Sequence, residues 1–319
     1  MAAGLAKVRA RRREDGTTQH GSQAACETGI TEHALGGKAE RLTLKSAARC
    51  MSANFKAPRS ETTERVRRDC GEDAFFVAAP TSTVASVGIA DGVGSWSGRG
   101  IDPALFAWEL MNRCQDVAER GAAALSHSSD PKRLLESGFE LVRKAVGGAP
   151  VGSSTACVAS LDRLSGELRV ANLGDSGALL VRGSSGDCVL ESKAQQHRFN
   201  CPYQLMVPPP GYAGGDDPKA ADVYAAKAQE GDLLLLATDG VLDNISREEM
   251  CEAARGHRHE GPEAVAEKIV RLARARAEGS DETPFSLAAR AAGYRHFGGK
   301  PDDITVIVAR VERAPVGEE

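Results

Sequence analysis

Residues 154–182 decide the fold class, and they read STACVASLDRLSGELRVANLGDSGALLVR. Three strand-like apolar runs follow one another here, at 154–161, 167–173 and 177–182, with only the short segments 162–166 and 174–176, rich in Ser, Gly and Asp, between them. Connections this short join antiparallel strands, because parallel neighbours need a crossover of about a dozen or more residues. The stretch therefore predicts antiparallel pairing rather than strict βαβ alternation.

The other strands and helices are expected in clusters. Further strands are expected at 74–78, 84–90, 232–237 and 303–311. Helices are expected from Asp102-Pro103 to about 120, from Asp130-Pro131 with apolar positions up to Val146, from the capping box Ser246-Arg-Glu-Glu249, at about 262–278 and at 284–292. The pattern predicts an α+β fold, a layered sandwich with helices packed outside two sheets.

The composition excludes several classes of protein. The chain has 319 residues, of which 41% are hydrophobic but only 4% aromatic, and its formal net charge is -4. Few aromatic rings and a negative charge argue against a protein that coats nucleic acid. The eight cysteines form no CxxC pair, and there is no apolar run of about 20 residues, so neither a zinc site, a disulfide framework nor a membrane span is indicated. We expect a soluble, intracellular protein with reduced cysteines, and a monomer.

The chain divides by composition into three parts. Residues 1–61 are expected to be a basic segment, disordered or targeting, because residues 1–60 hold 11 Lys or Arg against 5 Asp or Glu. A transit peptide and a disordered basic tail both fit the five basic groups in the first thirteen residues, since Glu14 and Asp15 follow at once. Residues 62–312 are expected to form one globular domain, and 313–319 a short tail.

Asp residues recur where the apolar runs begin or end, usually beside a Gly. The examples are Val87-Gly-Ile-Ala-Asp91-Gly92, Leu168-Arg-Val-Ala-Asn-Leu-Gly174-Asp175, Leu233-Leu-Leu-Leu-Ala-Thr-Asp239-Gly240 and Asp302-Asp303-Ile-Thr-Val-Ile-Val308, with Gly71-Glu72-Asp73 similar in character. Any single one is also ordinary turn chemistry. Strand ends, however, hold side chains rigidly and can aim several carboxylates at one point, where their repulsion requires a cation. Because oxygen ligands with few His or Cys favour Mg²⁺ or Mn²⁺ over zinc, the sequence predicts a hard-metal site.

Such a site has a defined chemistry. If Asp91, Asp239 and Asp302 meet near the carbonyl of Gly92, they can hold two ions about 3.5–4 Å apart. A water that bridges two divalent ions loses its proton near neutral pH and is suited to attack phosphorus, while the ions absorb charge on the phosphoryl oxygens.

Six motifs in their order along the chain resemble the metal-dependent serine/threonine protein phosphatases of type 2C (PPM). They are Gly71-Glu72-Asp73-Ala, Ala90-Asp91-Gly92-Val-Gly, Gly152-Ser-Ser-Thr155, Leu173-Gly174-Asp175-Ser176-Gly, Ala237-Thr-Asp239-Gly240-Val-Leu-Asp243-Asn244 and Pro301-Asp302-Asp303-Ile-Thr-Val. The resemblance covers roughly 62–312. It implies hydrolysis of phosphoserine or phosphothreonine on phosphoprotein substrates by a metal-bridging water, with Mn²⁺ or Mg²⁺ as cofactor. It also implies a four-layer αββα sandwich with two central, mainly antiparallel sheets flanked by helices.

Three stretches are more similar to the branch of this family found in mitochondria and plastids: Asp91-Gly-Val-Gly-Ser-Trp96, Phe199-Asn-Cys-Pro-Tyr-Gln204 and Gly298-Gly-Lys-Pro-Asp-Asp-Ile-Thr305. They favour a transit sequence at the basic start, so a mitochondrial or plastid location is expected beside a cytoplasmic one. His197, just before the second stretch, is interpreted as a structural histidine rather than a ligand.

Carried over by position, the resemblance implies two metal ions. Asp91 is expected to bridge both, and the carbonyl of Gly92 to bind one of them. Asp239 and Asp302 match the ligands of the other ion, with the adjacent Asp303 as the alternative to Asp302.

A further tier of acidic residues is implied in the same way. Glu72 and Asp73 match residues that hold metal-bound waters. Asp175, helped by Asp239 and Asp243, matches a third and weaker metal site.

Phosphate recognition falls on an arginine. The family often places an Arg four residues before the Glu of the first motif, which is Arg68 here, with Arg65 and Arg67 as alternatives. A guanidinium can bind a phosphate dianion through two parallel hydrogen bonds. Arg68 therefore joins Asp91 and Asp239 as an expected catalytic residue.

One position departs from the family. Val93 stands where many members have a His that is proposed to protonate the leaving group, so no general acid is assigned. The alternative to an enzyme is a catalytically inert, phosphatase-like interaction module, which the loss of a matched Asp would support; all of them are present. A phosphotransferase or nucleotide hydrolase is disfavoured, because the sequence has neither a GxxxxGK[ST] loop nor a DxD nucleophile motif.

Overall fold

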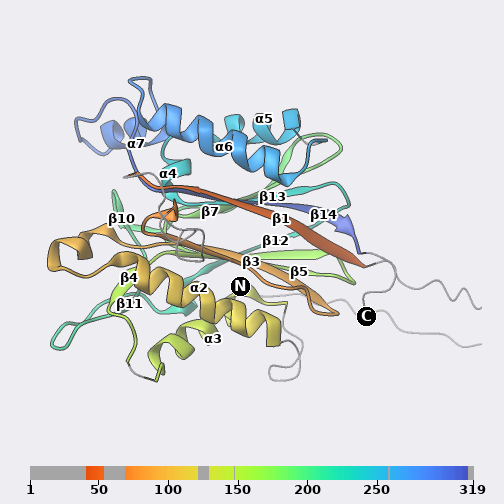
Figure 1. Cartoon of the computed structure of the whole chain (residues 1–319). Coiled ribbons are helices and arrows are strands. Elements are labelled where there is room, and N and C mark those ends of the chain that lie inside the picture. Colours follow the sequence, from red (N-terminus) through yellow and green to blue (C-terminus); the bar gives the residue numbers. More distant parts are fainter. Residues whose placement is uncertain (1–40, 54–68, 121–128, 147, 258, 315–319) are drawn as a thin grey trace, which may run out of the picture. The chain divides into compact units, whose positions relative to one another are not determined.

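The computed structural model describes residues 41–53, 69–120, 129–146, 148–257 and 259–314. Two five-stranded sheets lie face to face, and helices cover both outer faces (Figure 1). Neighbouring strands in both sheets pair antiparallel throughout. The α+β sandwich expected from the sequence is confirmed.

The first sheet has the strand order β1-β14-β13-β7-β8. Its strands are β1 (Leu42–Met51), β14 (Ile304–Arg313), β13 (Leu233–Ala237), β7 (Gly177–Val181) and β8 (Cys188–Glu191). The helices on this side are α4 (Asp239–Leu242), α5 (Arg247–His257), α6 (Pro262–Ala277) and α7 (Pro284–Ala291). Of these, α4 directly follows β13, and α6 packs on β1 and β14.

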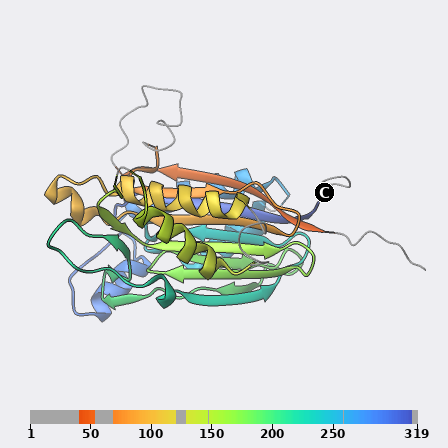
Figure 2. The same cartoon turned by 90° about the horizontal axis from the view of Figure 1, so that it is seen from below.

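The second sheet has the strand order β12-β6-β5-β3-β2. Its strands are β12 (Asp222–Lys227), β6 (Glu167–Leu173), β5 (Ala156–Asp162), β3 (Val84–Asp91) and β2 (Asp73–Val77). Helices α2 (Pro103–Arg120) and α3 (Pro131–Arg143) lie against each other on its outer face (Figure 2). The short elements are η1 (Gly94–Arg99), η3 (Pro218–Ala220), and the strand pairs β4 (Gly152–Ser154) with β11 (Leu205–Val207) and β9 (Gln196–Arg198) with β10 (Cys201–Pro202).

Each interface between layers has its own apolar core. Ala159 and Leu234 lie in the core between the sheets, whereas Val158 points to α2 and α3, and Leu235 to α5 and α6. Because these strands are covered on both faces, they are apolar without alternation, which is why they read as continuous apolar runs.

Two helix starts follow the expected capping chemistry. The Asp130 carboxylate accepts the backbone N–H of Lys132 at 3.0 Å. Ser246 and Glu249 bond reciprocally, with side chain to backbone distances of 2.8 and 3.2 Å. These contacts satisfy N–H groups that a first helical turn leaves without partners. Helix α3 ends at Arg143, however, so Val146 lies beyond it and is exposed, contrary to its expected place on the apolar face.

The third apolar run of 154–182 belongs to a different sheet from the first two. β6 pairs with β5 and β12, but β7 pairs with β13 of the first sheet. The segment between β6 and β7 begins at Gly174, whose φ of 106° lies in the left-handed region, and carries the chain from one sheet to the other. The expected succession of hairpins is therefore correct for β5 and β6 and wrong for β7.

Strand β1 corrects the expected domain boundary. All of Leu42–Met51 pairs with β14, so a domain that starts at 62 is wrong. Leu44 and Ala48 pack against the core between the sheets, while Lys45 and Arg49 are exposed. Charged side chains are common on edge strands, and here they hide the strand within a basic segment.

A disulfide joins Cys50 at the end of β1 to Cys70 just before β2. The expectation that all cysteines are reduced is therefore wrong. The two strands meet only in the tertiary structure, so the spacing of 20 residues gave no sign of the pair. None of the helices in the described ranges has the length and apolarity that a membrane span needs.

Candidate metal centre

Acidic side chains from both sheets gather where the strands end. Asp73 begins β2 and stands directly opposite Asp91 at the end of β3. Asp239 follows β13 as the first residue of α4, and Asp302 stands just before β14. The hydroxyl of Thr238 donates to Asp73 Oδ2 at 3.0 Å and so joins the end of β13 to β2. The tertiary structure thus brings together the carboxylates that the sequence singled out.

The turn after Asp91 requires a glycine. The N–H of Gly92 donates to the carbonyl oxygen of Glu72 at 3.1 Å. A Cβ at position 92 would lie 2.7 Å from that oxygen and 2.8 Å from the carbonyl oxygen of Pro103. Any side chain here would push β3 away from β2 and α2, and would move Asp91 with it.

Asp302 and its neighbour Asp303 have different tasks. Asp303 Oδ1 accepts the N–H of Ala53 at 2.6 Å, and its Oδ2 accepts the N–H of Glu72 at 2.7 Å. Asp303 thereby fixes the segments after β1 and before β2. Asp302 lies with Asp239 and Asp243 around the ammonium of Lys300, which favours Asp302 over Asp303 as the ligand.

Lys300 lies among three of the carboxylates. Its Nζ is 2.6 Å from Asp239 Oδ2, 2.7 Å from Asp243 Oδ2 and 3.2 Å from Asp302 Oδ2. Burial alone would lower the pKa of Lys300, but the three carboxylates outweigh it and raise that pKa above its ordinary value. Lys300 therefore stays protonated and is a positive charge inside the cluster.

Burial, together with mutual repulsion, raises the pKa of the carboxyl groups. Burial and then the charge of Asp239 raise the pKa of Asp91 well above its ordinary value. The same two causes raise the pKa of Asp302 and of Asp175 to about 6, and that of Asp243 to about 7. A bound cation would lower the pKa of these carboxyl groups and displace their protons. The cluster is therefore suited to bind a cation.

Glu72 and Asp73 belong to the part of the cluster that lies near Asp303. Burial, followed by the charge of Asp303, raises the pKa of Glu72 to about 6 and that of Asp73 well above its ordinary value. The Ser97 hydroxyl donates to Glu72 Oε1 at 3.2 Å and ties η1 to this edge.

Asp175 has a carboxylate oxygen to spare. Its Oδ2 accepts a hydrogen bond from Gln196 Nε2 at 2.9 Å, whereas its buried Oδ1 has no hydrogen-bond partner among the described residues. The side chain is close enough to Asp239 for their charges to interact. A buried oxygen without a partner is costly, and a bound cation would satisfy it.

The residues fit a hard divalent cation, although the cluster is closed around an ammonium group. Within the described ranges, no three Asp, Glu, His or Cys side chains stand in ready metal-ligand geometry. The donors are all carboxylate or carbonyl oxygens, one of them is buried without a partner, and they repel one another. This donor set suits Mg²⁺ or Mn²⁺ and not zinc.

Of the two expectations on phosphate chemistry, the phosphate-binding arginine lies outside the described residues, and the missing general acid at Val93 lies within them. Arg68 and its alternatives Arg65 and Arg67 fall outside the described ranges. Val93 begins the η1 turn, where its N–H donates to the carbonyl oxygen of Ser153 at 3.0 Å. Its aliphatic side chain has no proton to give, so the position of a general acid stays unassigned.

His197 has structural partners. It lies 3.1 Å from Asp216 Oδ2 and stacks on Tyr203 with 4.2 Å between ring centroids. These contacts link β9 to the loop after β11, in agreement with a structural histidine.

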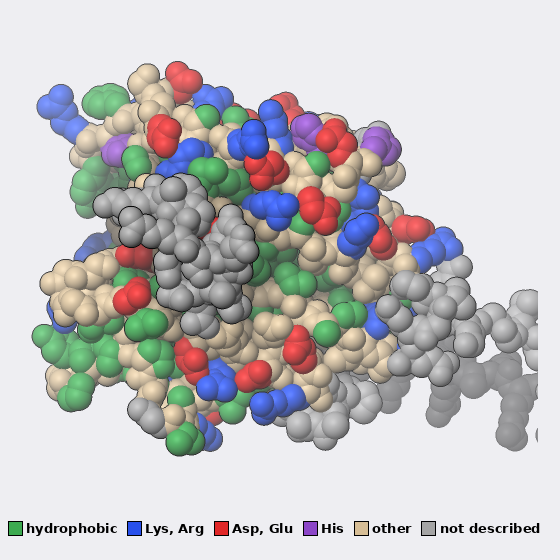
Figure 3. Space-filling view, in the orientation of Figure 1, with side chains coloured by type: hydrophobic (Ala, Val, Ile, Leu, Met, Phe, Trp, Pro, Cys, Tyr) green, Lys and Arg blue, Asp and Glu red, His purple; other side chains and the backbone are tan. Residues whose placement is uncertain are grey.

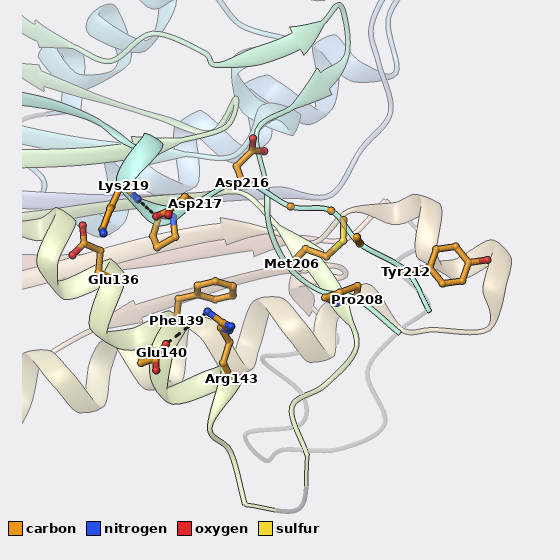
Figure 4. A pocket seen from close by; sticks show the side chains of 14 residues that line it. Glu136, Phe139, Glu140, Arg143, Met206, Pro208, Tyr212, Asp216, Asp217 and Lys219 are labelled. Atoms are coloured by element: carbon orange, nitrogen blue, oxygen red, sulfur yellow. Dashed lines mark hydrogen bonds and ion pairs between the residues drawn. The ribbon is translucent and has the colours of Figure 1, made fainter. Parts of the chain in front are cut away.

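A separate hollow of about 650 Å³ lies between α3 and the loop after β11 (Figure 4). Phe139 and Arg143 of α3 form one wall, and Met206, Pro208 and Tyr212 form another. The candidate metal ligands are not among its lining residues.

On the face shown in Figure 3, Lys and Arg side chains are interspersed with Asp and Glu side chains and do not form patches of one charge.

The fold and the cluster together define the class: an αββα sandwich with an acidic centre at the strand ends. A sequence model of the family described as "Stage II sporulation protein E (SpoIIE)" matches residues 86–312. The chain is 40% identical over 251 residues to the Drosophila mojavensis protein "Protein phosphatase PTC7 homolog fig", covering 76% of this chain and 78% of that one. It is 39% identical over 253 residues to the human "Protein phosphatase PTC7 homolog", covering 76% and 79%.

Solved structures agree. The "photosystem II phosphatase PBCP" aligns with a TM-score of 0.68 at 28% identity, covering 84% of this chain and 99% of that one. The catalytic domain of the phosphatase PstP, in complex with two manganese ions, shares the fold with a TM-score of 0.50 at 18% identity, covering 85% and 99%. The chain belongs to the PP2C (PPM) family and is a protein serine/threonine phosphatase.

Sequence reasoning missed Lys300 and the structural task of Asp303. Both lie in the Gly298-Gly-Lys-Pro-Asp-Asp stretch, which drew attention only for its similarity to a family branch. A lysine two residues before a candidate metal ligand was the available signal. The partners of these residues lie far away in the sequence, so the signal had no interpretation without the fold.

Proposed function

We propose that this phosphatase requires Mn²⁺ or Mg²⁺ and hydrolyses phosphoserine and phosphothreonine on protein substrates. One observation carries the proposal: Asp91, Asp239 and Asp302 converge from strand ends of both sheets, and the repulsion among the cluster's carboxylates calls for a cation. Asp91 would bind both ions, with the carbonyl of Gly92 on one and Asp239 and Asp302 on the other. When bound, such ions act as Lewis acids toward water and the phosphoryl oxygens.

Other residues are proposed to have further roles. Glu72 and Asp73 present further carboxylates at the edge held by Asp303, where they would accept hydrogen bonds from bound water. Asp175 offers its unpartnered Oδ1 for a third, weaker site with Asp239 and Asp243. Arg68 is proposed to orient the phosphate.

The test is hydrolysis of a phosphothreonine peptide by the full chain, with and without Mn²⁺. We expect turnover only with the metal, and its abolition in Asp239→Asn. Asp187→Asn is the matched control, because Asp187 is exposed on the turn between β7 and β8. A protein that binds Mn²⁺ but turns over no substrate would favour the inert interaction module instead.

The location of the protein stays a prediction. A mitochondrial or plastid location is proposed from the five basic groups in the first thirteen residues and from the motif similarity alone. A fluorescent fusion that keeps the natural amino terminus tests it.

A further inference from the structure

The backbone of Lys300 is held firmly beside the cluster. Its N–H donates to Asn244 Oδ1 at 2.9 Å, and Asn244 Nδ2 donates back to the Lys300 carbonyl oxygen at 2.8 Å. Asn244 is itself buried and donates to the carbonyl oxygen of Gly240, so the lysine backbone is fastened to the turn that carries Asp239. Its side chain is only 17% exposed. Lys300 is therefore an integral residue of the centre and not a surface lysine.

The preceding turn allows little movement of the backbone. A Cβ at Gly299 would lie 2.1 Å from the carbonyl oxygen of Arg276, and Pro301 follows Lys300 directly. The four-carbon side chain can still rotate, because a lysine is a point charge on a flexible stem. The Phe285 ring, 5.1 Å from Nζ, is a second partner beside the carboxylates.

We propose that Lys300 is an internal counter-ion that competes with the metal ion held by Asp239 and Asp302. This inference rests on the proposed function. The ammonium engages one oxygen of each of three carboxylates, two of which are the proposed ligands of that ion. A divalent cation and an ammonium repel each other at such distances, so the ion binds this side of the centre only as the ammonium leaves it.

The competition has two consequences. Lys300 stabilises the metal-free protein, because it neutralises carboxylates that otherwise repel one another. It also weakens the binding of one metal ion, so that its removal creates a tighter site. If Lys300 served only as a structural ion pair, its removal would destabilise both the metal-free and the metal-loaded form, and would leave metal affinity unchanged or lower.

The experiment is titration calorimetry of Mn²⁺ into the metal-free full chain, with melting curves of the metal-free and Mn²⁺-loaded forms. Lys300→Gln and Lys300→Met remove the charge, and Met keeps most of the stem. We expect one Mn²⁺ site to tighten by roughly tenfold, the order expected for removal of one partly screened charge. The melting temperature should fall for the metal-free form and stay nearly unchanged for the loaded form. Lys268→Gln, an exposed lysine of α6, should match the wild type in both measurements.

A second measurement is used for a variant that does not fold without metal, because it starts from the metal-loaded protein. The Mn²⁺-loaded proteins are mixed with excess EDTA, and Mn²⁺ release is followed. Lys300→Gln should release one ion more slowly than wild type, and Lys300→Arg, which keeps the charge, should resemble wild type. Equal or weaker Mn²⁺ binding by Lys300→Gln, or equal release, would overturn the inference while leaving the proposed function intact. A wild-type protein that takes up no Mn²⁺ would overturn the proposed function itself.

Discussion

The centre has two sides, one formed by Asp73 and Asp91 and the other by Asp239 and Asp302, and they differ in the source of their counter-charge. Asp73 and Asp91 stand opposite each other on β2 and β3, and no Lys or Arg in the described ranges forms an ion pair with them. Asp239 and Asp302, beside β13 and β14, share the ammonium of Lys300. Among the described residues, one half of the centre therefore has no counter-charge of its own, whereas the other half carries one until a metal ion replaces it.

Replacement of one carboxylate on each side by the neutral Asn should have the largest effect on activity, and it tests whether the two sides differ. Asp91→Asn and Asp239→Asn should each lower kcat/KM by about 10³-fold, since each removes several kcal/mol of charge stabilisation by the metal. Their metal-free forms should differ: Asp91→Asn relieves repulsion and should melt higher, whereas Asp239→Asn leaves Lys300 with fewer partners and should melt lower. Phosphopeptide kinetics and melting curves measure both. Equal shifts in melting temperature would show that the two sides do not differ.

The disulfide tests how the two sides are held together. Cys50 and Cys70 join β1 of the first sheet to the start of β2 in the second. Cys50→Ser should lower the free energy of unfolding by about 3 kcal/mol, the value for closing a loop of this length. Denaturant unfolding with and without reductant measures it, and the wild type under reductant should match the variant. Stability that does not respond to either change would contradict the prediction.

The adjacent residues Asp302 and Asp303 should differ in the same way, one in metal binding and the other in stability. Asp303→Ala leaves the N–H groups of Ala53 and Glu72 without their acceptor and should cost about 2 kcal/mol of stability. Asp302→Ala should weaken Mn²⁺ binding with a smaller effect on the unfolding of the metal-free protein. Chemical denaturation and calorimetry of the pair provide the measurement. The reverse pattern would assign the metal to Asp303.

The pH dependence should show the smallest effect. The pKa of Glu72, Asp175 and Asp302 is raised to about 6 and that of Asp243 to about 7. A carboxyl group whose pKa is raised by folding stabilises the fold when protonated, and this contribution is lost as the pH rises through the raised pKa. The melting temperature of the metal-free protein should therefore fall by a few degrees from pH 5 to pH 8.

Metal uptake should follow the opposite course. Mn²⁺ affinity should increase over the same interval, because the ion displaces protons from these groups. In saturating Mn²⁺ the slope of melting temperature against pH should flatten. A melting temperature that rises from pH 5 to pH 8 without metal would contradict the assignment of repulsion in the cluster.

The sequence was informative where the cause was local. The apolar runs of β5 and β6 and the caps of α3 and α5 follow from short-range chemistry and were predictable. β1 was not, because Lys45 and Arg49 on an edge strand hide its apolar face. Nor was the passage of β7 to the other sheet, since a turn at Gly174 is compatible with a hairpin as well as with a crossing.

By itself the sequence determined the class of fold, the family motifs and the identity of the acidic residues. These depend on periodicity and on residue type, which are properties of short stretches. Only the tertiary structure decided which carboxylates share a cation, that Asp303 fastens backbone while Asp302 faces the centre, and that Cys50 meets Cys70. Lys300 stands 61 and 57 residues from Asp239 and Asp243 along the chain. Contacts between residues so far apart arise from the packing of whole sheets, and no local pattern encodes them.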